Sequence, residues 1–132
     1  MIDITDEDRA LIKAHIILPR VLTAFERDAA LINTTLKTPA PYADMIAEAQ
    51  RKLTADIYEI RKQFRTRGIK VYEELTDSDG VVARYKCRGY QSEMKLRWMI
   101  LAPQATDVMR SYLGVPTKDF IDPSIPEWLQ RK

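Results

Sequence analysis

The stretch RTRGIKVYEELTDSDGVVARYKCRGY, residues 65–90, decides the fold that the sequence predicts. Apolar and polar residues alternate on both sides of its centre, which is the period of a half-buried β-strand. The central TDSDG, residues 76–80, is rich in residues that favour tight turns. We therefore predict one two-stranded antiparallel β-hairpin over about residues 69–88.

Basic residues gather at both outer ends of this stretch, whereas its turn half is acidic. Residues 61–70 contain five positive charges and no acidic residue. Pairing around the Asp-Gly turn would bring Lys70 close to Lys86 and Arg88, beside the end of the preceding helix. The candidate phosphate contacts are therefore Arg61, Lys62, Arg65, Arg67, Lys70, Lys86 and Arg88.

Helices are predicted on both sides of the hairpin. In the first, Thr5 is the N-cap and Asp8 completes a capping box, and apolar residues at three-to-four spacing reach Ile32. Pro19 lies inside this pattern and predicts a kink, because it removes a hydrogen bond to the carbonyl of His15. A loop rich in Thr and Pro follows, over residues 33–41.

The second helix is predicted from about Tyr42 to Arg67, with Gly68 as its C-terminal cap. The third is predicted from about Tyr90 to Leu113, with a second kink at Pro103. Its seam has the spacing of a bundle helix and consists of Met94, Trp98, Leu101, Ala105, Val108 and Tyr112.

The predicted fold class is α+β and mainly α, with three long helices, two of them kinked by proline. The two-stranded hairpin lies between the second and third helices. Residues 1–114 form a single domain, and residues 115–132 form a proline-rich tail with at most one helical turn near residues 127–131. A short loop between the first two helices favours an antiparallel pair.

Composition excludes several classes of protein. The 132 residues suit one domain, and the single cysteine cannot form an internal disulfide. The acidic N-terminus is unlike a signal peptide, and no apolar run approaches the ~20 residues that span a bilayer. We expect a cytoplasmic protein without a membrane partner. The net charge is only +2, but residues 51–97 hold twelve Lys and Arg against seven Asp and Glu.

Three segments occur together in a distinctive order: DRALIKAHIILPRVLTAFERD, then RTRGIKV, then YKCRGY ahead of a tryptophan-containing helix. In this order they resemble the YhjD-like small proteins of Bacillus-type bacteria and their phages, over roughly residues 5–113. The resemblance implies a bacterial or phage cytoplasmic protein. It carries no catalytic signature and transfers no functional residue.

Catalytic and metal sites are not expected. His15 is the only histidine and lies on an apolar helix, so a structural role is favoured. Cys87 has no activating base near it in sequence and is expected to be a small buried residue. DSDG from Asp77 begins like a calcium loop, but Arg88 occupies the position of the bidentate glutamate. The carboxylates near Asp8 suit a helix N-terminus. We expect no enzyme, no cofactor and no metal.

Two binding hypotheses remain open. In the first, a regulatory or accessory protein contacts the DNA or RNA backbone through the basic base of the hairpin. In the second, an inhibitor, adaptor or assembly factor binds a protein partner, or a second copy of itself, through its helical seams or its tail. The candidate partner-binding residues are Trp98, Ile125, Trp128 and Leu129.

Overall fold

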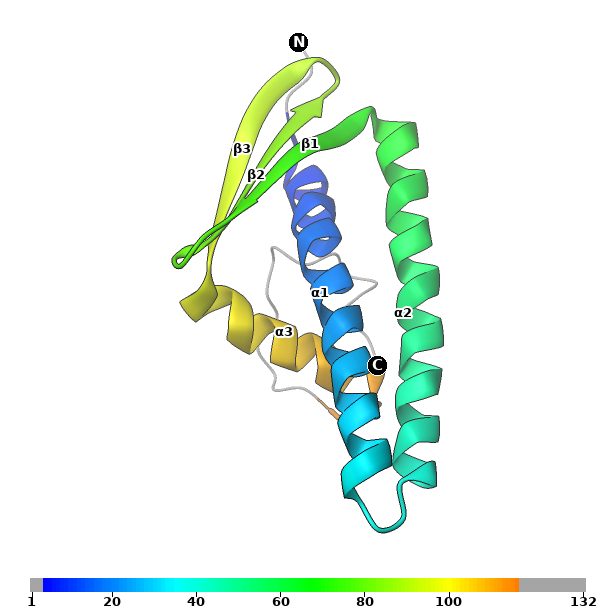
Figure 1. Ribbon diagram of the computed structural model, residues 1–132. Coiled ribbons are helices and arrows are strands. Elements are labelled where there is room, and N and C mark those ends of the chain that lie inside the picture. Colours follow the sequence, from blue (N-terminus) through cyan, green and yellow to red (C-terminus); the bar gives the residue numbers. More distant parts are fainter. Residues whose placement is uncertain (1–3, 117–132) are drawn as a thin grey trace.

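The computed structural model describes residues 4–116 (Figure 1). The elements follow in the order α1 (Asp6–Thr35), α2 (Ala40–Arg67), β1 (Ile69–Thr76), β2 (Gly80–Cys87), β3 (Tyr90–Arg97) and α3 (Trp98–Tyr112). The predicted class, mainly helical with an antiparallel sheet, is confirmed. The three strands form one sheet in the order β1-β2-β3, so the prediction of a two-stranded hairpin is wrong.

The helices α1 and α2 lie antiparallel along most of the length of the molecule (Figure 1). At the start of α1 the predicted capping box is present, because Thr5 and Asp8 each bond the other's backbone N–H. The helix α2 ends at Gly68, which has a φ of 68°. Pro19 and Pro103 both lie inside continuous helices, and the predicted kinks are not shown.

The third strand replaces the first two turns of the helix that was predicted from Tyr90. The β2–β3 loop consists of Arg88 and Gly89, whose φ values of 51° and 87° are both positive. Two-residue hairpin loops of this kind match the twist of the strands. After the loop, polar residues alternate with Ser92, Met94 and Leu96, and this period of two is the strand signal.

A β-bulge changes the direction of side chains halfway along β1. Val71 pairs with Tyr85 and Glu73 with Arg84, so Tyr72 is an extra residue without a partner of its own in β2. The bulge shifts the alternation by one position. After the bulge, side chains that would otherwise point outward therefore point toward the helices. Side chains that would otherwise point toward the helices point outward.

The core lies between α1, α2, the inner face of the sheet and the start of α3. Its buried residues form one cluster. From α1 the cluster takes, among others, Leu18 and Phe25, and from α2 it takes Leu53 and Ile60. The sheet contributes mainly β2, through Val81, Ala83, Tyr85 and Cys87. Thus the inward side chains of β2 pack the sheet against α1.

The turn between β1 and β2 is fixed to the start of α3. Asp77 accepts hydrogen bonds from the backbone N–H groups of Asp79 and Gly80 through Oδ1, at 2.8 and 3.1 Å. The indole Nε1 of Trp98 donates to the carbonyl of Asp77 at 2.8 Å. The acidic turn therefore lies at the sheet–α3 junction, away from the end of α2.

Candidate functional site

The seven predicted phosphate contacts lie around the end of α2 and the adjoining ends of β1 and β2. Figure 1 shows that the end of α2 and the β2–β3 loop reach the same end of the molecule. The structure divides the seven side chains into two groups. Arg67 and Arg88 are partly buried in ion pairs, while Arg61, Lys62, Arg65, Lys70 and Lys86 are exposed.

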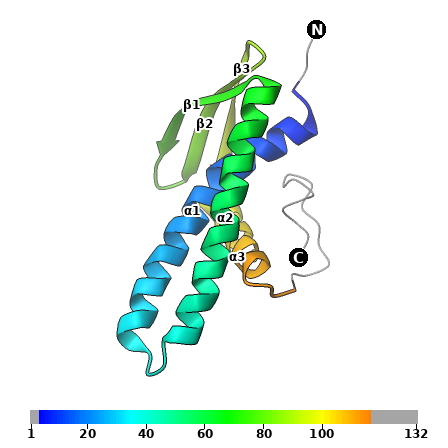
Figure 2. The ribbon, with the colours of Figure 1, turned by 90° about the vertical axis from the view of Figure 1, so that its right-hand side faces the viewer.

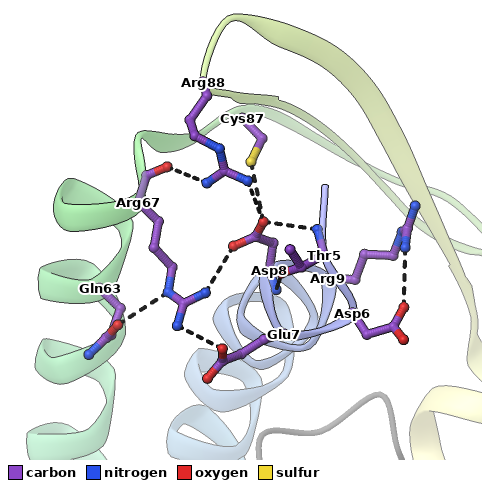
Figure 3. A network of polar contacts seen from close by, with 9 residues as sticks. All are labelled: Thr5, Asp6, Glu7, Asp8, Arg9, Gln63, Arg67, Cys87 and Arg88. Carbon is purple, nitrogen blue, oxygen red and sulfur yellow. Dashed lines mark hydrogen bonds and ion pairs between the residues drawn. The ribbon is translucent and has the colours of Figure 1, made fainter. Parts of the chain in front are cut away.

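Arg67 and Arg88 meet the carboxylate of Asp8 at the start of α1 (Figure 3). Arg88 donates from Nη2 to Asp8 Oδ2 at 2.6 Å, and Arg67 donates from Nη1 to Asp8 Oδ1 at 3.1 Å. Arg67 also pairs with Glu7 at 2.9 Å. Nη1 of Arg88 donates to the carbonyl of Arg67 at 2.7 Å, which binds the β2–β3 loop to the end of α2.

The Asp8 side chain is only 1% exposed, so its environment sets its charge. Burial by itself raises the pKa of the carboxyl. The hydrogen bonds from the Thr5 backbone, Arg88 and Arg67 outweigh burial and hold the Asp8 pKa well below its usual range. Asp8 is therefore a stable anion that three parts of the chain share, and together with Glu7 it balances the charges of two predicted phosphate contacts, Arg67 and Arg88.

Cys87 lies against the same carboxylate, with its Sγ 3.7 Å from Asp8 Oδ2. Burial raises the pKa of the thiol, and the charge of Asp8 raises it further. A thiol in this environment stays protonated and is a poor nucleophile. The geometry agrees with the structural role that was predicted for this cysteine.

The five exposed cations, Arg61, Lys62, Arg65, Lys70 and Lys86, are called the basic end below. Lys70 and Lys86 lie directly opposite each other in the β1–β2 register. Like charges at such positions repel and oppose pairing of the strands. Among residues 4–116, neither lysine takes part in an ion pair.

Tyr72, the extra residue of the bulge, adds an aromatic ring to this surface. The ring is exposed, and the Nζ of Lys86 lies 5.9 Å from its centroid. This distance is within the range of a cation–π contact. The lysine and the ring therefore lie side by side on the surface of the sheet.

A second polar cluster, which the sequence did not reveal, lies on the other side of β1. Glu74 contacts His15 Nε2 at 3.7 Å and Arg20 Nη1 at 3.4 Å. The His15 ring also lies 5.0 Å from the ring of Phe64. Burial lowers the pKa of His15, although the nearby Glu74 opposes this. The bulge is the reason that Glu74 reaches α1, since unbroken alternation would point it outward.

The predicted partner-binding residues are mostly outside the part of the chain that can be described. Ile125, Trp128 and Leu129 lie beyond residue 116, outside the described residues. Trp98 is half-buried, packs against the core and bonds the β1–β2 turn. Its contacts in the structure are internal to the chain.

Within residues 4–116, no group of three or more His, Cys, Asp or Glu side chains is arranged to hold a metal ion. No helix of this described part has the length and apolar character needed to cross a bilayer.

Comparison with known proteins places the chain in a family. The model of the YhjD protein family matches residues 3–117, which include all six helices and strands. The chain belongs to the YhjD family. The uncharacterized protein YhjD of Bacillus subtilis (strain 168) is 29% identical over 119 residues, which are 89% of this chain and 99% of that protein. The match to the family model spans every helix and strand described above, in agreement with the resemblance seen over roughly residues 5–113. No solved structure matches the chain.

Proposed function

We propose that this chain is a small cytoplasmic regulatory or accessory protein that acts by binding and not by catalysis. Its basic end contacts the phosphates of a nucleic acid. The observation that carries the proposal is the pairing of Lys70 opposite Lys86, two exposed lysines that form no ion pair within residues 4–116. An arrangement that costs folding free energy is understandable if a polyanion supplies the missing charge.

The arrangement of charge in the rest of the site supports this proposal. Asp8 holds Arg67 and Arg88 in place, and thereby fixes the end of α2 against the β2–β3 loop. The exposed cations thus project from a surface whose shape is fixed before binding, which lowers the entropy that binding must overcome. Asp77 and Asp79 lie in the β1–β2 turn, at the opposite end of these strands from Lys70 and Lys86, where they do not oppose a phosphate at the basic end.

The test is binding of a labelled mixed-sequence oligonucleotide, measured by fluorescence anisotropy from 50 to 200 mM salt. Contacts to about four phosphates predict a slope of log K against log salt near −3. Replacing both paired lysines, Lys70→Glu with Lys86→Glu, should weaken binding at least about tenfold and make the slope shallower by about 1.5. Arg67 and Arg88 are unsuitable for this test because replacing either one removes a counter-charge of the buried Asp8 carboxylate, which would also change the stability of the fold.

The matched control changes the same amount of charge elsewhere. Lys37→Glu with Lys52→Glu alters two exposed lysines outside the basic end and gives the same net charge. This double variant should bind nearly as tightly as the parent chain. Equal losses of oligonucleotide affinity in the two double variants would contradict a localised site. If the parent chain does not bind at 50 mM salt, the proposed function itself is contradicted.

A protein–protein module is the second candidate, and a different surface favours it. The end of the α1–α2 pair carries four exposed apolar side chains, Leu31, Leu36, Tyr42 and Met45. Apolar side chains grouped on a surface are typical of interaction sites. Sedimentation should then show association that depends on concentration and is lost in Leu31→Lys with Met45→Lys. A monomer at all concentrations would count against self-association.

A further inference from the structure

The outer face of the sheet, the one directed away from the helices, extends the basic end across all three strands. The register and the bulge place eleven side chains on this face: Lys70, Tyr72, Glu73, Leu75, Val82, Arg84, Lys86, Gln91, Glu93, Lys95 and Arg97. In Figure 2 the sheet lies at the left of the view, and the first turns of α1 lie to its right. None of the three helices covers the outer face.

The charge of the outer face suits an anionic ligand. It carries five cations and two carboxylates, which leaves a net charge of +3. Both carboxylates form ion pairs at the centre of the face, where Arg84 contacts Glu73 at 3.2 Å and Glu93 at 3.6 Å. Lys95 also contacts Glu93, at 3.7 Å. Lys70 and Lys86 stay available on one side of these pairs, and Arg97 on the other.

Tyr72 gives this face a feature that phosphate binding alone does not require. Tyr72 is 45% exposed on the edge strand, and Lys86 contacts one side of its ring by a cation–π interaction. Leu75, further along the same strand and face, is 48% exposed. An aromatic ring on an open sheet between cations is a surface on which an unpaired base stacks. The bases of a duplex are already stacked on one another and do not offer a free face.

A hydrogen-bond acceptor on the same face favours RNA over DNA. The amide of Gln91 lies opposite Lys86 in the β2–β3 register, and its oxygen is an acceptor outside the ion pairs that engage Glu73 and Glu93. The 2′-hydroxyl of a ribose donates to such acceptors, and the sugar of DNA has no donor at this position. The Gln91 amide carries no charge, so it does not oppose a phosphate on the neighbouring lysines.

From these observations we infer that the outer face binds single-stranded RNA, with one base stacked on Tyr72 and the adjacent phosphates on Lys70 and Lys86. The inference rests on the proposed function and specifies its ligand. The basic residues at the end of α2 then hold the continuing strand beyond the edge of the sheet.

The experiment compares three labelled ligands of equal length: a mixed-sequence 12-nucleotide RNA, the DNA of the same sequence, and the RNA duplex. Anisotropy titrations at 50 mM salt should show tightest binding to the single-stranded RNA. Tyr72→Leu should weaken that binding by about tenfold, the loss expected for one stacked base, while Tyr72→Phe retains most of it. Tyr42→Leu is the control, because Tyr42 is an exposed tyrosine at the opposite end of the α1–α2 pair.

The outcomes separate the inference from the proposed function. Equal binding of duplex and single strand, equal binding of DNA and RNA, or no effect of Tyr72→Leu would each overturn the inference and leave phosphate binding intact. Failure of all three ligands to bind would overturn the proposed function as well. Urea midpoints of the Tyr72 variants should match the parent, and a matching midpoint assigns any loss of binding to the ring.

Discussion

Asp8 joins three distant parts of the chain through a single carboxylate. It completes the capping box of α1, and it also accepts hydrogen bonds from Arg67 at the end of α2 and Arg88 in the β2–β3 loop. Arg88 adopts a positive φ, which is uncommon for a residue with a side chain. The ion pair with Asp8 therefore helps to stabilise a loop conformation that the backbone alone disfavours.

The substitution Asp8→Asn tests this role. Asparagine keeps the shape of the side chain and an acceptor for Thr5, but it removes the counter-charge of Arg88 and leaves Arg67 with the more exposed Glu7 alone. We expect the free energy of unfolding in urea to fall by about 3 kcal/mol. The control Asp6→Asn changes an exposed carboxylate in the same helical turn and should cost less than about 0.5 kcal/mol. Similar losses in both variants would contradict the role of Asp8.

The dependence of stability on pH follows from the lowered pKa of Asp8. In the folded state the carboxyl gives up its proton more readily than in the unfolded state, so the unfolded state binds more protons in acid. The stabilisation is complete above the unfolded pKa of about 4 and is lost as the pH falls toward the folded value. The difference in the free energy of unfolding between the parent chain and Asp8→Asn, measured in urea, should become smaller below about pH 4. A constant difference would be inconsistent with this assignment.

Residue by residue, the sequence predicted local contacts better than distant ones. The Thr5 capping box was predicted correctly because its partners are three residues apart. The ion pairs of Asp8 were not predicted, since Arg67 and Arg88 are 59 and 80 residues away in the chain. For this reason the sequence did not reveal that two arginines assigned to phosphate binding are partly buried in ion pairs with an acidic residue.

Among the elements, the β1–β2 turn depends on the absence of a side chain at Gly80. A Cβ at this position would lie 2.0 Å from the carbonyl oxygen of Leu96 and 2.8 Å from the Cα of Arg97, both backbone atoms of β3. Gly80 therefore permits β2 to begin against the end of β3. The requirement is steric, because it comes from a close approach of two strands.

Gly80→Ala should destabilise the protein by at least about 2 kcal/mol, because the strands must move apart to admit the methyl group. The loss is measured from the urea midpoint. Ser78→Ala, in the same exposed turn, should leave the midpoint nearly unchanged and serves as the control. A Gly80→Ala chain as stable as the parent would show that β3 can move away from β2 at little cost in folding free energy.

The elements that the sequence predicted best are those with a long, uniform period. The helix α2 was predicted from about Tyr42 and begins at Ala40, and both versions end at Arg67. The strand β3 was missed because Met94, Trp98 and Leu101 also fit helical spacing, and because an Arg-Gly loop lacks the usual Asn-Gly or Asp-Gly signal. The bulge was missed too, since Tyr72 continues the alternation in sequence and breaks it only in the register with β2.

For the molecule as a whole, one buried cluster includes residues from all three helices and from β1 and β2, with Met94 and Leu96 of β3 packed against it. Leu53 in α2 and Trp98 at the start of α3 belong to the same packed unit although they come from different elements. A single core of this kind predicts that helices and sheet unfold together. No element has a separate core that would let it persist by itself.

Leu53→Ala should lower the free energy of unfolding by about 3 kcal/mol, because a fully buried side chain is replaced by a cavity. The measurement uses a Trp128→Phe background, so that fluorescence reports on Trp98 alone. In the parent and in Leu53→Ala, the urea midpoint from Trp98 fluorescence should equal the midpoint from far-ultraviolet circular dichroism, although both midpoints are lower in the variant. The control Leu31→Ala, at an exposed position of α1, should shift the free energy of unfolding by less than about 0.5 kcal/mol. Separate midpoints would reveal two independent folding units.

The position of Asp8 also has a consequence for the order in which the chain is made. Protein synthesis delivers α1 and α2 before the sheet, so these two helices can pair while the strands are still being made. The carboxylate near the beginning of the chain meets Arg88 only after 80 further residues have been added. A nascent chain arrested before that point should therefore carry a loosely attached α1 N-terminus, which completion of the β2–β3 loop then secures.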